Sequence, residues 1–261
     1  MAVNEGFFIM RLSKDTCEII AFFGLIVVFE VCERLRPARK VDRFVDLKLD
    51  ALSFVFALAV NRISTKLFFA TIGDKTPQFF QSWSGFIVTV PSALKICAAI
   101  FVADFMIYWI HRAQHRYGTL WRTHAWHHSV EQMYWFAGFR TSFFHSFIYN
   151  IPQAFVPLMI FQLSPAEAGI GYSIALLIQF WEHTNLKVNI GPLKYLIITP
   201  EYHRIHHSAT VQRGKNLGTT FVLWDKWFGT YVDPATMPEN YPLGLGEPIE
   251  KKKIPRMLLG V

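Results

Sequence analysis

Histidines dominate the part of the sequence that could do chemistry. HAWHH, residues 124–128, and HRIHH, residues 203–207, each place imidazoles at i, i+3 and i+4. HRAQH, residues 111–115, has an imidazole at each end. On a helix, such spacings bring the side chains to one face. Imidazole is a ligand for iron, zinc, copper and nickel, so the pattern predicts metal coordination, and eight such rings suit two ions.

All ten histidines fall between residues 111 and 207. Histidines at ordinary surface or core positions would scatter along the chain, so this confinement indicates one shared site. Beyond the metal ligands we predict no catalytic residue, and His145 is predicted either as a tenth ligand or as a neighbour of the ligands. The nine predicted ligands are His111, His115, His124, His127, His128, His183, His203, His206 and His207.

Asp104 lies seven residues before His111, two helical turns back on the same face. A carboxylate in an apolar helix needs a partner, and metal-binding imidazoles commonly donate their second N–H to a carboxylate. Asp104 is therefore predicted to orient one of the ligands. The alternative is an ion pair with Lys95 or Arg112.

The composition is that of a membrane protein. Hydrophobic residues make up 52% of the chain, including 25 phenylalanines, whereas charged residues make up only 17%, less than a soluble surface needs. The net charge of +7 is spread between apolar stretches, which favours anionic lipid headgroups over nucleic acid as the partner. The three cysteines show no CxxC spacing, so neither a disulfide framework nor a thiolate zinc site is expected, and no removable signal peptide is expected.

Several stretches approach the roughly 20 apolar residues that a membrane helix needs. In the stretch at residues 49–72, Arg62 leaves two alternatives: the helix ends near Val60, or Arg62 faces a protein partner. In the third, Pro91 and Lys95 lie in the first half, where a kink or a snorkelling lysine is tolerated. The last two are expected to form a helical hairpin with a turn at Ser164 and Pro165. The stretches are residues 17–32, 49–72, 86–110, 143–163 and 168–181.

The predicted fold is all-α: a bundle of about four to five membrane-inserted helices with a cytosolic helical cap that carries a di-metal site. Residues 33–48 contain six lysines and arginines and residues 72–85 contain one, which places the first loop in the cytosol. Every histidine then lies at the cytosolic membrane surface. The predicted regions are transmembrane helices at 1–110, a catalytic region at 111–232 with a membrane hairpin at about 143–182, and a proline-rich basic tail at 233–261.

The three boxes, with DFMIYW before the first and NLGTTFVLWDKWFGTY after the third, closely resemble the fatty acid hydroxylase and sterol desaturase superfamily of integral membrane di-iron enzymes. The resemblance runs from about Asp104 to Tyr231. It matches His183 and Asn185 to recurring positions, and Asn185 is expected to support the ligands. Many members have a histidine where this chain has Ser142, and some have one at Lys187, so the additional ligands differ here.

Aromatic residues crowd the stretch EQMYWFAGF, residues 131–139, which precedes Arg140. Packing in the core is one use of these residues. An apolar wall for the substrate near the metals is the other, with Trp135, Phe139 and Arg140 as its candidate residues.

The resemblance implies activation of O2 by two iron ions, with two electrons per turnover from an external donor such as cytochrome b5, a ferredoxin or a flavoprotein reductase. It implies hydroxylation or desaturation of a hydrophobic substrate, such as a sterol or fatty acyl lipid, that enters from membrane lipids of the bacterial inner membrane or endoplasmic reticulum. The residues alone also allow a di-zinc membrane hydrolase, or a metal-binding transport or structural protein. Turnover without O2 would indicate the hydrolase, and ligands at the bilayer midplane would indicate transport.

Overall fold

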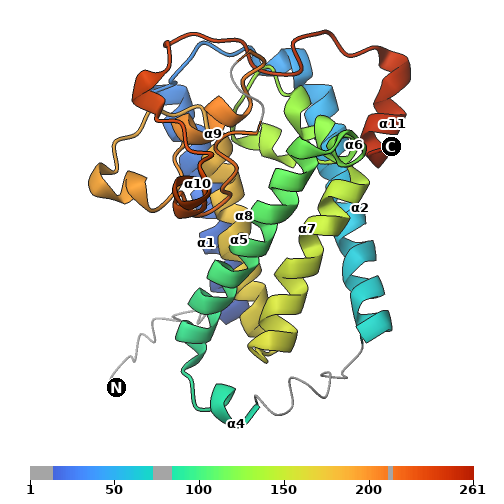
Figure 1. The fold of residues 1–261 in the computed structure, drawn as a ribbon, viewed down its shortest axis with the longest axis vertical. Helices are drawn as coiled ribbons and strands as arrows, with labels where there is room; N and C mark the ends of the chain where they lie inside the picture. The colour runs from blue at the N-terminus through green and yellow to red at the C-terminus, as the bar shows by residue number, and fades with distance from the viewer. Residues whose placement is uncertain (1–13, 73–83, 211–213) are drawn as a thin grey trace, which may run out of the picture.

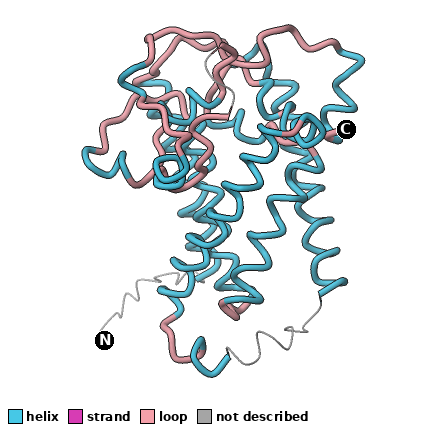
Figure 2. Tube along the Cα trace, viewed as in Figure 1, coloured by secondary structure: helices cyan, strands magenta, loops and turns pink. Residues whose placement is uncertain are grey.

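The computed structural model describes residues 14–72, 84–210 and 214–261. Within these residues the chain is helical and has no β-strand, only isolated bridges such as the one between Ile197 and Phe221. The all-α prediction is therefore confirmed. Long helices stand side by side, and short helices gather at one end (Figure 1). Most of the loops lie at that end too, which we call the cap (Figure 2).

The long helices form the bundle: α1 (Lys14–Leu35), α2 (Arg43–Ile72), α5 (Ser92–Arg116), α7 (Phe143–Phe155) and α8 (Pro165–His183). A π-helical turn, Val156–Ile160, continues α7, and α4 (Ser84–Ile87) lies at the end opposite the cap. The cap helices are α6 (Gly118–Ala125), α9 (Pro200–His206), α10 (Leu223–Phe228) and α11 (Ile254–Leu259). Short 3-10 turns cover His127–Ser129, Trp135–Phe139, Gly191–Tyr195, Pro234–Thr236 and Lys251–Lys253.

Pro91 divides the third predicted membrane stretch. Proline lacks an N–H and clashes with the preceding helical turn, so α4 ends at Ile87 and α5 begins at Ser92. From there α5 continues without a break through HRAQH, which sets His111 and His115 one turn apart. Among the described helices, α5 alone combines the length and hydropathy needed to cross a bilayer.

The second stretch is one continuous helix. α2 runs to Ile72 and passes Val60 without interruption, so the alternative in which it ends there is wrong. Arg62 is exposed on this helix. The other alternative, that Arg62 faces a protein partner, stays a prediction.

The predicted hairpin is present as α7 and α8. Their connection ends in a capping box, in which the backbone N–H of Ser164 donates to Glu167 Oε2 at 2.8 Å and the Ser164 hydroxyl accepts from the backbone N–H of Glu167 at 3.3 Å. Pro165 occupies the first turn, where its missing N–H costs nothing. α8 extends as far as His183, so that ring is held on a helix rather than in a loop.

The outward faces of the bundle helices expose large apolar side chains. Soluble monomers rarely expose contiguous apolar surface of this kind. Helices that face lipid show this pattern. Examples are Phe23, Val27 and Val31 on α1, Leu52 and Val55 on α2, and Leu94 on α5.

The segment 233–261, predicted as a tail, packs against the rest of the protein. The Arg39 guanidinium donates to the carbonyl of Tyr241 at 2.9 Å, and the N–H of Ala209 donates to the carbonyl of Pro242 at 2.9 Å. At the end of α11, a Cβ on Gly260 would lie 2.6 Å from the Ser142 hydroxyl, so only glycine fits. The segment therefore closes the cap beside α6 and α7.

Candidate metal centre

Nine imidazoles converge in two adjacent groups at the cap end of the bundle. Within each group the candidate ligand nitrogens all lie within 4.8 Å of one another. The first group consists of His111, His115, His124, His128 and His206, and the second of His127, His183, His203 and His207. These are the nine histidines that the sequence predicts as ligands, and His145 lies outside both groups.

Each HxxHH box supplies both groups. In HAWHH, His124 and His128 enter the first group and His127 the second, whereas in HRIHH the outer two histidines enter the second group and the middle one the first. The boxes meet directly, because Nε2 of His207 lies 3.1 Å from Nε2 of His127. The i+3 ring therefore crosses to the other group, so the three rings of a box do not serve a single ion.

Backbone carbonyls orient four of the rings through Nδ1. Because a carbonyl only accepts hydrogen bonds, Nδ1 carries the proton and Nε2 turns a lone pair toward the group. The four bonds run from His111 to Leu217 at 2.7 Å, from His127 to Arg140 at 3.1 Å, from His183 to Gln179 at 2.7 Å and from His206 to Lys215 at 2.9 Å.

This arrangement fits bound metal ions. Nε2 of His111 lies 2.8 Å from Nε2 of His124, and the buried Nε2 of His206 has no hydrogen-bond partner among the described residues. Two nitrogens at right angles on an ion, with bonds of about 2.0–2.1 Å, lie about 3 Å apart. Converging lone pairs repel one another without a cation, and an ion in each group would accept them.

Burial favours the neutral imidazole, which is the form that coordinates metals. It is the largest cause that lowers the pKa of His128 and His207 well below 6.5, and the neighbouring imidazoles lower it further. Burial also lowers the pKa of His206 to about 4. These ligands need not lose a proton to bind a metal near neutral pH.

Glu182 is a candidate functional residue that the sequence reasoning missed. Its side chain is buried, with Oε2 at 3.4 Å from Nδ1 of His203 and Oε1 at 3.7 Å from Nδ1 of His183. A carboxylate beside the second nitrogen of a ligand fixes the ring and raises its basicity. The available signal was a carboxylate directly before a predicted ligand, at the end of an apolar helix.

The structure corrects the role predicted for Asp104. Seven residues of helix separate it from His111 by about 10 Å, too far for contact. The carboxylate instead fastens α5 to the loop whose Leu217 carbonyl orients His111, and among the described residues it accepts from no imidazole. Its donors are the Thr219 hydroxyl at 2.6 Å, the Phe221 N–H at 3.1 Å and the Trp224 indole N–H at 2.7 Å.

Two of the three predicted substrate contacts face other helices. The Arg140 side chain is buried and donates to Asp50 of α2, with Nε at 2.8 Å from Oδ1. The Trp135 indole donates to Glu30 of α1 at 2.6 Å. A buried guanidinium needs such a carboxylate, which explains the direction of Arg140, and the indole N–H of Trp135 needs an acceptor. Only Phe139 lines the cavity described below.

Asn185 supports the site from a distance. Its side-chain amide exchanges two hydrogen bonds with the backbone of Arg39, at 3.1 Å and 2.8 Å, and its N–H donates to Glu33 at 2.7 Å. It thereby ties the end of α8, two residues after His183, to the α1–α2 connection. Its hydrogen bonds go to these groups and not to a ring.

His145 lies beside the first group. Its Nδ1 is 3.0 Å from Nδ1 of His124, and its ring packs on Tyr149 with 4.1 Å between centroids. The ring therefore contacts a predicted ligand from outside, as the second of its two predicted roles requires.

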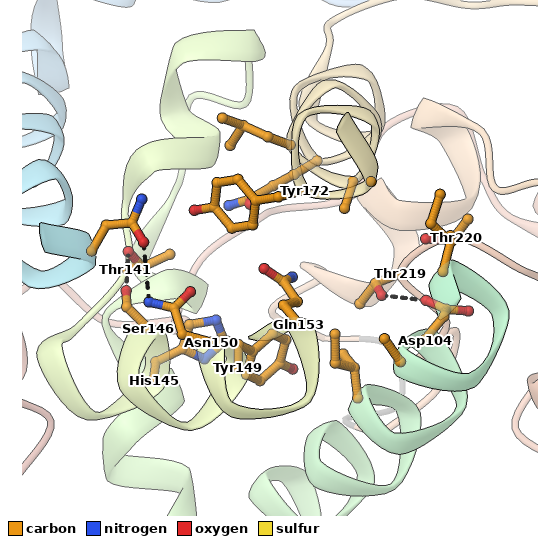
Figure 3. A pocket seen from close by; sticks show the side chains of 18 of the residues that line it. Asp104, Thr141, His145, Ser146, Tyr149, Asn150, Gln153, Tyr172, Thr219 and Thr220 are labelled. Atoms are coloured by element: carbon orange, nitrogen blue, oxygen red, sulfur yellow. Dashed lines mark hydrogen bonds between the residues drawn. The ribbon is translucent and has the colours of Figure 1, made fainter. Parts of the chain in front are cut away.

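A cavity extends from the metal groups down the bundle between α2, α5, α7 and α8 (Figure 3). His111, His124, His127 and His203 line one end of it. On α5 the lining reaches from Ile96 to His111, a rise of about 1.5 Å over each of fifteen steps, or about 22 Å. The acyl chains of one leaflet fill about half of the roughly 30 Å hydrocarbon core, or about 15 Å. The lining is longer than this, so it can accommodate a long alkyl chain.

Comparison with known proteins identifies the family. The fatty acid hydroxylase family model matches residues 96–230. Human alkylglycerol monooxygenase is 30% identical over 246 residues, or 92% of this chain. This chain belongs to the fatty acid hydroxylase family. The resemblance seen in the three histidine boxes is thereby confirmed.

Other relatives in this family are also named as lipid oxidising enzymes. The ornithine lipid hydroxylase of Rhizobium tropici is 31% identical over 62% of this chain, and human lathosterol oxidase is 25% identical over 58%. The chain spans about half the length of these curated relatives, 52%, 48% and 49% of the three proteins respectively. No solved structure matches the chain significantly.

Proposed function

We propose that the protein is a membrane-bound non-haem di-iron oxygenase that uses O2 and two electrons to hydroxylate or desaturate an apolar lipid-like substrate. The observation that carries the proposal is the pair of imidazole groups at one end of a cavity whose lining follows α5 over about 22 Å. The names of the relatives support a lipid, such as a sterol or a fatty acyl lipid, as the substrate class.

When bound, two iron ions would supply the activation of O2. Hydroxylation consumes two electrons and two protons, places one oxygen atom in a C–H bond and releases the other as water. Desaturation removes two hydrogens from the substrate and releases both oxygen atoms as water. The same imidazoles serve either outcome, so the C–H bonds that the cavity presents at His111 and His124 decide between them.

The protein contributes rigid placement and exclusion of water. Buried carbonyls fix the second nitrogen of four rings, and Glu182 lies beside that of His203, so much of the ligand set is organised before a substrate arrives. Many aliphatic side chains line the cavity, which favours an alkyl chain over water inside it. An oxidant formed there would meet the substrate before solvent.

We also propose the membrane arrangement. The five long helices would insert in the bilayer of the bacterial inner membrane or the endoplasmic reticulum, with the cap and its metals on the cytosolic face. Residues 1–110, 111–232 and 233–261 would serve as anchor, catalytic region and closing segment. A cytosolic donor such as cytochrome b5, a ferredoxin or a flavoprotein reductase would dock on the cap and supply the electrons.

Metal analysis of the purified protein, combined with mass spectrometry of lipids from cells with and without it, tests the proposal. We expect two irons per chain and an O2-dependent product that has gained one oxygen atom or lost two hydrogens. Anaerobic turnover with zinc bound would instead establish the membrane hydrolase. A protein that binds metal and changes no lipid would support a transport or structural role.

A further inference from the structure

The described wall of the cavity carries polar groups and neutral imidazoles but no permanently charged basic side chain. Among the described residues that line it there is no lysine or arginine, and its two carboxylates are Asp104 and Glu182. Along the part of this wall away from the metal groups, a buried anionic group would lose its hydration without gaining a counter-cation. The wall therefore favours ligand groups that are uncharged.

Tyr149 is a hydrogen-bond donor inside this cavity. Its hydroxyl is buried and has no hydrogen-bond partner among the described residues. Buried hydroxyls are nearly always paired, because an unpaired one loses its bond to water without replacement. An oxygen atom of a bound ligand would restore the bond.

The tyrosine ring is held at the metal end of the cavity. Tyr149 follows His145 by one turn of α7, and the two rings pack with 4.1 Å between centroids. The His111 ring of the first metal group lies 6.3 Å from the tyrosine ring. Figure 3 shows His145 and Tyr149 adjacent on α7, with Tyr172 of α8 across the cavity. The ring that carries the hydroxyl is therefore held beside the first metal group.

We propose that the cavity binds an uncharged lipid that bears an oxygen atom, and that Tyr149 is the residue that recognises this oxygen by donating a hydrogen bond to it. The bond would fix the distance between that oxygen and the metals, and so select which carbon along the chain is oxidised. The proposal rests on the proposed oxygenase function and adds the class of substrate and one specificity residue.

The test compares the purified wild-type protein with Tyr149→Phe, which removes only the hydroxyl. The probes are 1-hexadecanol, hexadecane and palmitate, each measured by displacement of a fluorescent long-chain alcohol from the protein in nanodiscs. Tyr117→Phe, the same change at an exposed position outside the cavity, is the matched control. Metal content and the thermal unfolding midpoint are measured for all three proteins.

We expect the wild-type protein to bind hexadecanol about tenfold more tightly than hexadecane, the size of one hydrogen bond, and more tightly than palmitate. Tyr149→Phe should remove the preference over hexadecane and leave metal content and unfolding unchanged, because the hydroxyl has no protein partner to lose. Retention of the preference in this variant would overturn the role of Tyr149. Palmitate binding as tight as hexadecanol binding would overturn the uncharged class.

Lipid binding does not require turnover, so the two proposals can fail separately. Discrimination between the probes in a protein that never oxidises lipid would leave this inference standing and remove the oxygenase. Oxidation of lipid by a protein that binds the three probes equally well would overturn this inference and leave the oxygenase proposal standing.

Discussion

Among single residues, each HxxHH box supplies ligands to both metal groups. A substitution at one histidine can therefore disturb one group and leave the ligands of the other in place. Replacing His206 by alanine removes a ligand of the first group, and replacing His127 removes one of the second. We expect each variant to lose at least one of the two ions and all turnover while still inserting in the membrane. Metal analysis beside a membrane fractionation measures this, and two irons retained in either variant would contradict the assignment.

Glu182 gives a second prediction at this scale. Removing its carboxylate in Glu182→Ala should weaken metal binding about 10–100-fold, because His203 loses the group beside its Nδ1. Glu182→Gln keeps an acceptor oxygen and should lose less. Glu247→Ala, the same change at an exposed position, is the control. Chelator competition ranks the variants, and equal affinity in all of them would show that Glu182 does not support the ligand.

At the scale of elements, Gly138 lets the 3-10 turn Trp135–Phe139 approach the end of α8. A Cβ at this position would lie 3.2 Å from Nδ1 and 3.3 Å from Cγ of His183. We expect Gly138→Ala to shift this ring and to lower the occupancy of the second group while the helix content stays unchanged. Circular dichroism measures the helix content, and metal analysis measures the occupancy of the second group. Full occupancy in the variant would show that the His183 ring can move aside without losing the metal. Gly85→Ala, where the new Cβ meets nothing within 4 Å, is the control.

The junction between α5 and the loop at 217–224 depends on Asp104. Its replacement by alanine leaves the buried indole N–H of Trp224 without its acceptor, at about 1–3 kcal/mol, and also removes the acceptor of the part-buried donors of Thr219 and Phe221. We expect a lower unfolding midpoint and, because the same loop carries the carbonyl of Leu217, weaker metal binding. Unfolding measured with and without metal separates the two effects, and an unchanged midpoint would contradict this account.

At the scale of the whole molecule, the distribution of basic residues predicts the orientation in the membrane. With the native cysteines replaced, we expect Lys40→Cys to resist a membrane-impermeant maleimide added to intact cells and Lys75→Cys to react with it, since the arginine-rich first loop stays in the cytosol. Labelling after lysis is the control. The reverse pattern would place the cap on the opposite face.

The sequence by itself determined the family, the helical class and the nine histidines that meet. Local spacing is enough for these, because imidazoles at i, i+3 and i+4 share a helix face and apolar stretches of sufficient length form helices. The break at Pro91 and the turn at Ser164 were likewise local, although the exact helix ends were not.

Only the tertiary structure decided which ring joins which group, which carboxylate supports the ligands and where Arg140 and Trp135 point. Asp104 bonds to residues 115 to 120 positions later in the chain, and His127 meets His207 eighty positions later. Such pairs depend on how the helices pack and on which buried charge can find a counter-charge. The spacing of residues along one helix predicts neither the packing of the helices nor the pairing of buried charges.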